Sequence, residues 1–221
     1  MTRIFGSPDT EKVISMNRFR SGKSLSPIRQ AEAYWHALRD GAEVPRRTQI
    51  DPRGLANILE HAFVLERIAP GIARFRLAGS HLNDLAGMEV RGMPLTSFFT
   101  PTGRAQIGAV LEHMFDTPAV AELSLGGESR RGRPRPDARM ILLPLQSDLG
   151  DVNRALGVLI ADKSTGQSPQ RFDVTDLTLR PVADLQAIRP AITQPNREPV
   201  AGFAEDPQPL QGRAPYLKLI Q

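Results

Sequence analysis

The sequence contains no cysteine in its 221 residues. Disulfide bonds, thiolate metal sites and cysteine nucleophiles are therefore excluded, and the absence fits a reducing compartment. Residues 1–16 hold no apolar run of signal-peptide length, and no stretch approaches the roughly 20 apolar residues that a membrane span needs. We expect a cytoplasmic protein that has no membrane segment.

Aromatic residues are also scarce, at 5% of the chain, whereas 40% of all residues are hydrophobic. The core must therefore be built mainly from aliphatic side chains. Charge of one sign is in little excess, because 28 Lys and Arg face 24 Asp and Glu, which gives a formal net charge of +4. Such a mild basic balance is a weak argument for nucleic acid or an anionic surface as a partner.

The chain lacks the common catalytic motifs. It has no nucleophile elbow, no recognisable pair of catalytic carboxylates and no zincin helix. The four histidines, at positions 36, 61, 81 and 113, show no zinc spacing. We expect no enzyme, no metal and no cofactor. An unrecognised enzyme is left open as an alternative, since catalytic groups can converge from distant positions.

Proline marks the organisation of the chain. Residues 164–221 contain eight prolines, which disfavour long helices and central strands, so we expect a mostly irregular tail with a short docked element near 172–185. Residues 1–24 are polar and read as a flexible arm. The folded part is expected over residues 25–163.

Within residues 25–163 the spacing of hydrophobic residues alternates between the period of a helix and the period of a strand. Ser26 and Pro27 are a helix start, and an amphipathic stripe predicts a longer helix from Thr100 to about Phe115. Strands are predicted at 61–68, 73–79, 119–125, 139–146 and 154–161. The order is helix, short helix, two strands, short helices, long helix and three strands.

Four ordered blocks carry a family resemblance. They are YWHALR at 34–39, VPRRTQIDP at 44–52, FRLAGS at 75–80 and LLPL at 142–145. With the spacing of Leu82, Leu85 and Gly87, they resemble a family of bacterial single-domain PAS proteins over about residues 30–162. The resemblance implies an α+β PAS fold: a five-stranded antiparallel sheet with helices on one face, plus an N-terminal helical extension.

The resemblance also implies a sensory or adaptor domain in bacterial signalling, one that acts on a ligand or a protein partner and has no catalytic output of its own. In a PAS fold the inner sheet face and the central helices enclose a cavity, which could take a small apolar ligand or be a dry core. The candidate lining residues are Phe75, Leu77, Leu85, Phe98, Val110, Met114, Leu123 and Leu143.

Two further sets of residues stand out. Arg46, Asp51 and Arg76 are expected to form a structural charge-assisted network, with anion binding as the alternative. Tyr34, Trp35 and Leu38 on the first helix are candidates for a homodimer interface, and the alternative is that Trp35 caps the core.

The arginine-rich run at 130–135 is the competing signal. An extended Gly-Arg-Pro core flanked by arginine resembles an AT-hook, which lays arginines in the minor groove of DNA. A nucleic-acid-binding protein is therefore the alternative function. A Gly-Arg-Pro turn is also normal at this place in the PAS-like family, so we favour a solvated loop and do not expect nucleic acid as the partner.

Overall fold

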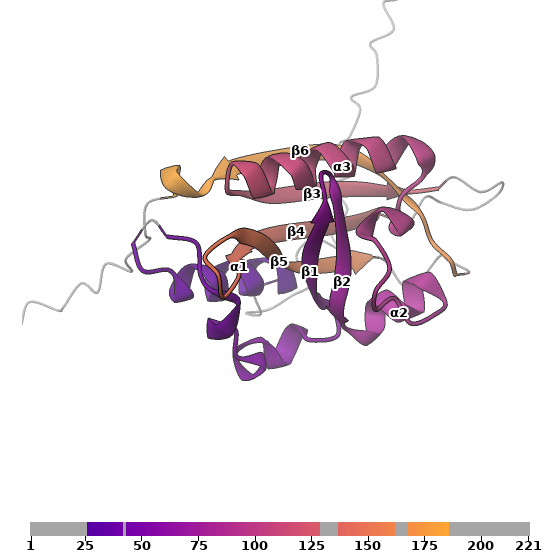
Figure 1. The fold of residues 1–221 in the computed structure, drawn as a ribbon. Helices are drawn as coiled ribbons and strands as arrows, with labels where there is room; N and C mark the ends of the chain where they lie inside the picture. The colour runs from indigo at the N-terminus through magenta and orange to yellow at the C-terminus, as the bar shows by residue number, and fades with distance from the viewer. Residues whose placement is uncertain (1–25, 42, 129–136, 162–167, 186–221) are drawn as a thin grey trace, which may run out of the picture. The chain divides into compact units, whose positions relative to one another are not determined.

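The computed structural model describes residues 26–41, 43–128, 137–161 and 168–185. A helix and two 3-10 turns precede a hairpin, a helical middle follows, and four further strands complete the sheet (Figure 1). The elements are α1 (Pro27–Leu38), η2 (Arg47–Gln49), η3 (Pro52–Ile58), β1 (Ala62–Ala69), β2 (Ile72–Ala78), α2 (Ser80–Ala86), η4 (Leu95–Phe98), α3 (Pro101–Asp116), β3 (Ala119–Gly127), β4 (Asp137–Gln146), β5 (Val152–Ala161), β6 (Phe172–Pro181) and η5 (Val182–Asp184).

Capping residues set the helix bounds as the sequence predicts. The Ser26 hydroxyl accepts the Arg29 amide at 3.5 Å, and the Thr100 hydroxyl accepts the Gly103 amide at 3.1 Å. Each cap is followed by proline at the first helical position, where no amide donor is needed. Gly87 ends α2 with φ of 72°, a left-handed conformation that glycine adopts without a steric penalty.

The sheet is antiparallel throughout, in the order β2-β1-β5-β4-β3-β6, and it confirms the expected PAS fold. The expected number of five strands was wrong, because β6 adds a sixth strand beside β3. This strand lies within residues 172–185, where we expected a short docked element in an otherwise mostly irregular tail. Its Phe172 is fully buried, and Pro181 is tolerated because it ends an edge strand.

The two faces of the sheet carry separate cores. On the inner face, α2, η4 and α3 cover sheet side chains such as Phe75 and Leu142, and Met114 of α3 packs in the same core. On the outer face, α1 and η3 cover side chains such as Val158 and Leu143. The expectation of helices on one face holds for α2, η4 and α3, and the expected N-terminal helical extension covers the other face. Strand β4 is buried on both faces, and this explains the unbroken apolar run in its sequence.

A β-bulge in the β1–β2 hairpin changes the sheet face to which the side chains at the end of β2 point. Val64 pairs with Leu77, but the next residue, Leu65, pairs with Phe75, so Arg76 is the extra residue in β2. Leu65 and Phe75 both belong to the inner core, whereas Val64 belongs to the outer core. Leu77 therefore points to the outer face, and 53% of its surface is exposed.

No helix within the described ranges is long and apolar enough to span a membrane.

Replacement of Gly157 by alanine is expected to lower the free energy of unfolding by about 1–3 kcal/mol, because the core is close-packed. A Cβ at this position of β5 would clash with Cζ of Phe63, whose ring is buried in the inner core. Gly108→Ala in α3 is the matched control, since its Cβ would meet only the Gly71 oxygen, at 3.4 Å. That variant should gain up to about 1 kcal/mol from helix propensity. Urea unfolding measures both, and equal effects would contradict the packing argument.

Candidate functional site

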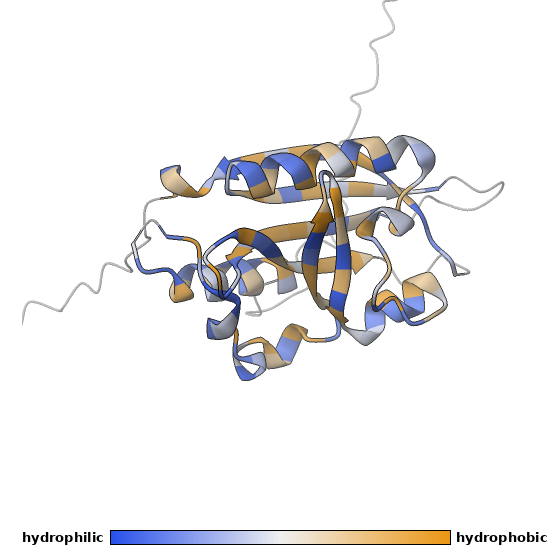
Figure 2. Cartoon of the chain, in the orientation of Figure 1, coloured by the Kyte–Doolittle hydropathy of each residue, from blue (hydrophilic) through white to orange (hydrophobic). Residues whose placement is uncertain are grey.

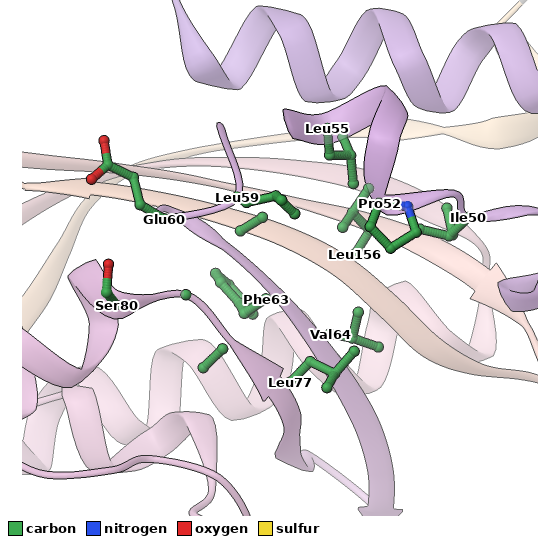
Figure 3. Close-up of a pocket in the computed structure, with 13 residues that line it drawn as sticks. Ile50, Pro52, Leu55, Leu59, Glu60, Phe63, Val64, Leu77, Ser80 and Leu156 are labelled. Atoms are coloured by element: carbon green, nitrogen blue, oxygen red, sulfur yellow. The ribbon is translucent and has the colours of Figure 1, made fainter. Parts of the chain in front are cut away.

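An apolar groove opens on the outer face of the sheet, with a volume of about 480 Å³ (Figure 3). It lies between η3 with the turn that follows it and the β1–β2 hairpin. Its lining residues are almost all apolar: Ile50, Pro52, Leu55, Leu59, Ala62, Phe63, Val64, Leu77, Ala78, Gly79 and Leu156, with Glu60 and Ser80 as the polar members. Figure 3 shows Glu60 and Ser80 at one end and Leu77, Val64 and Leu156 toward the other.

The wall formed by η3 is held by contacts with α1. The Asp51 carboxylate caps η3 by accepting the Arg53 amide at 2.9 Å. The Tyr34 hydroxyl accepts the Asp51 amide at 2.7 Å and donates to the Asp51 carbonyl at 3.2 Å. Gly54 lies directly against the Tyr34 ring, where a Cβ would be 2.3 Å from Cε2. Hydrogen bonds and ring packing thus join the η3 wall of the groove to α1.

Two leucines leave apolar surface open to water in the groove. Leu77 is 53% exposed and Leu59 is 44% exposed, although both face other apolar groups. Exposed leucines that line a concave apolar surface are typical of a binding site, whereas isolated exposed leucines are common everywhere. The arrangement can bind an apolar group, and it offers no pair of side chains suited to acid–base chemistry.

A cluster of charged side chains from the same hairpin and from β5 lies beside the groove. Figure 2 shows hydrophilic residues between hydrophobic ones in β1 and β2. Glu66 pairs with Arg154, with Arg74 at 2.8 Å and with Arg76 at 3.4 Å. The hydrogen bond from Arg154, with help from Arg74, outweighs partial burial and holds the pKa of Glu66 below its ordinary value. A second cavity of about 230 Å³ opens here, lined by Arg47, Val64, Arg76, Ser147, Asp148 and Arg154.

The structure brings six of the eight predicted pocket residues together in the inner core: Phe75, Leu85, Phe98, Val110, Met114 and Leu123. The prediction was wrong for the other two. Leu77 is turned outward by the bulge, and Leu143 alternates to the outer core one residue after Leu142. The outer groove was missed, because its lining depends on the bulge and on where α1 and η3 lie.

The predicted polar network is not formed as expected. Arg76 pairs with Glu66, while Asp51 caps η3, and the Arg46 amide donates to Gln49. The alternation of charged residues in β1 and β2 could have indicated the Glu66 cluster, since cross-strand partners of opposite charge stabilise a sheet. Glu66 and Arg74 are direct cross-strand partners.

The predicted dimer residues behave differently from one another. Trp35 is fully buried in its own chain, and its indole nitrogen donates to the Pro144 carbonyl at 2.8 Å. The assignment of Trp35 to a dimer surface was therefore wrong. The structure agrees with the alternative, that Trp35 caps the core. Tyr34 and Leu38 are partly buried, and a homodimer through them stays a prediction.

The histidines and the arginine run complete the predicted features. His81 is buried and accepts the Ala161 amide at 3.2 Å, which gives it a structural role. Among residues 26–185, with the gaps at 42, 129–136 and 162–167, no group of three or more His, Asp or Glu could hold a metal ion. The arginine run at 130–135 lies outside the described residues.

Comparison with known proteins places the chain in a family. No curated protein matches it. A solved structure, described as "Structure of an RNA-binding Light-Oxygen-Voltage Receptor", is similar at 18% identity and a TM-score of 0.34, over 53% of this chain and 35% of that one. The family model PAS_5, described as PAS domain, matches residues 23–160, which is more than half of the chain. The protein therefore belongs to this PAS domain family.

Proposed function

We propose that this PAS domain is a sensory or adaptor module of bacterial signalling that responds to binding in the outer groove and has no catalytic output. The groove between η3 and the hairpin receives a small apolar molecule, and α1 passes the event to a signalling partner. A cytoplasmic location is part of this proposal. Membership of the PAS family supports the sensory role.

The observation that carries the proposal is the shared wall of the groove. The η3 segment lines the groove, and the backbone of its N-cap residue, Asp51, is hydrogen-bonded to Tyr34 of α1. A molecule that fits the groove better in one position of η3 than in another shifts the population between the two, by its differential affinity for them. Because α1 is bonded to η3, the shift reaches the surface that α1 presents.

The test uses Nile red, an uncharged apolar dye, and the single tryptophan of the chain as the reporter. Trp35 is a buried residue of α1, so its emission reports how α1 packs on the sheet. The wild type should bind the dye and change its Trp35 emission. Leu77→Asp should weaken dye binding about tenfold or more, because it removes apolar contact area and places a charged group, which is costly to desolvate, against the dye.

Ile68→Asp is the matched control. Ile68 and Leu77 lie on the same hairpin and have the same exposed fraction, 53%, but Ile68 does not line the groove. This control should bind the dye as the wild type does. Equal weakening in both variants, or dye binding that leaves Trp35 emission unchanged, would contradict the proposed relay.

A further inference from the structure

The apolar groove and the arginine-lined cavity are neighbours. Both are lined by Val64 of β1, and the adjacent residues Arg76 and Leu77 of β2 line one each. The bulge causes this arrangement, because the extra residue allows the side chains of Arg76 and Leu77 to point to the same outer face. Without the bulge, two consecutive strand residues would point to opposite faces.

The arginine-lined cavity has a surplus of positive charge. Arg74, Arg76 and Arg154 share the single carboxylate of Glu66. Arg47 also lines the cavity, and no ion pair joins it to another residue of the described part. Asp148 is the one acidic residue in the lining. Three guanidinium groups therefore line the cavity beside one carboxylate, with Glu66 as the ion-pair partner of two of them, and an anion would balance the remaining charge.

We propose that the two cavities form one site for a free amphipathic anion, a fatty-acid-type carboxylate whose head lies on Arg47, Arg76 and Arg154. Its apolar chain lies in the groove against Leu59, Leu77 and Leu156. Guanidinium groups bind carboxylates through two parallel hydrogen bonds, which suits a carboxylate head. The inference rests on the proposed function, since it names the ligand class of the same groove.

The size of the groove favours a small molecule over a macromolecule. Its volume of about 480 Å³ lies within the 300–1,000 Å³ typical of small-molecule sites, and the head cavity adds about 230 Å³. An acidic peptide or an anionic membrane would present the same charge, so both are included as outcomes of the test.

The test is titration calorimetry of the full chain with dodecanoate, dodecanol and dodecylammonium, below the concentrations at which they form micelles. Dodecanoate should bind at least tenfold more tightly than dodecanol, and dodecylammonium more weakly than dodecanol. The advantage of dodecanoate should shrink as salt is raised, because part of it comes from partly exposed charges.

Variants separate the head from the chain. Arg47→Gln and Arg76→Gln should each weaken dodecanoate binding about tenfold and leave dodecanol binding unchanged, whereas Leu77→Asn should weaken both. The controls Arg46→Gln and Ile68→Asn change neighbouring residues that line neither cavity, and they should bind like the wild type. Circular dichroism checks that every variant is folded.

The outcomes distinguish this inference from the proposed function. Nile red or dodecanol binding that moves Trp35 emission, with no advantage for dodecanoate, would overturn the inference and leave the proposed function standing. Binding only to anionic vesicles or to a poly-glutamate peptide would also overturn the inference. If none of the apolar probes binds, both fail.

Discussion

Replacement of Trp35 by alanine is expected to lower the free energy of unfolding by about 3–5 kcal/mol, the range for a fully buried large aromatic. The indole is fully buried between α1 and the outer sheet face, and it is a member of the outer core. The change removes this contact, leaves a cavity and also removes the hydrogen bond to the Pro144 carbonyl. Urea unfolding followed by circular dichroism measures the effect.

Trp35→Phe separates packing from hydrogen bonding. This variant keeps a ring in the outer core but leaves the Pro144 carbonyl without its indole donor, so the expected loss is about 1–3 kcal/mol. Sedimentation of both variants tests the alternative that Trp35 is an interface residue. An alanine variant that unfolds like the wild type but no longer self-associates would contradict the assignment of Trp35 to the core.

Replacement of Glu32 by glutamine is expected to lower the free energy of unfolding by about 2 kcal/mol at pH 7, because the buried carboxylate loses charge-assisted hydrogen bonds while its partly exposed arginine partners stay in contact with water. The side chain of Glu32 is only 9% exposed, and it accepts from Arg29 at 2.8 Å and from Arg180 at 2.6 Å. In the variant, Glu122 is the remaining partner of Arg180, at 3.9 Å. The bond ties α1 to the edge strand β6.

The effect of Glu32→Gln should depend on pH in a defined direction. Burial raises the pKa of Glu32, but the hydrogen bonds and charges of Arg180 and Arg29 outweigh it, so the pKa lies below its ordinary value. A carboxylate with a lowered folded-state pKa stabilises fully above its unfolded pKa of about 4.3 and loses this contribution as the pH falls through the folded pKa. The difference between wild type and variant should therefore shrink below about pH 4.

Unfolding of both proteins from pH 7 to pH 3 measures this difference. The pKa of Glu66 is also lowered, but in both proteins alike, so the comparison isolates Glu32. Glu112→Gln, a change at an exposed position of α3, is the control and should have little effect at any pH. A loss that stays constant down to pH 3 would show that the charge of Glu32 is not its cause.

Local signals predicted the elements of this fold well. Ser26, Thr100 and Gly87 are capping residues whose chemistry acts within one helical turn, and the structure places helix ends at each of them. Strand β6 was harder to predict, because the many prolines of residues 164–221 favour an irregular chain and only a short docked element was expected there. Its pairing with β3 and the burial of Phe172 outweigh that preference.

The candidate site could not be predicted from the sequence, for two physical reasons. Strict alternation assigns Leu77 to the inner face, and only the pairing of β1 with β2 reveals the extra residue at Arg76. The pattern of α1 predicts an apolar stripe, but it does not say which sheet face that stripe covers. Both questions are decided by contacts between segments far apart in the chain.

The packing of α1 on the outer sheet face determines the shortest fragment of this protein that is suited to separate expression. A truncation that began at the first strand would uncover Ile141, Leu143 and Val158, all of them completely buried in the whole domain. A broad apolar sheet surface of that kind promotes aggregation. Fusions, biosensors and crystallisation fragments made from this protein should therefore start upstream of Ser26.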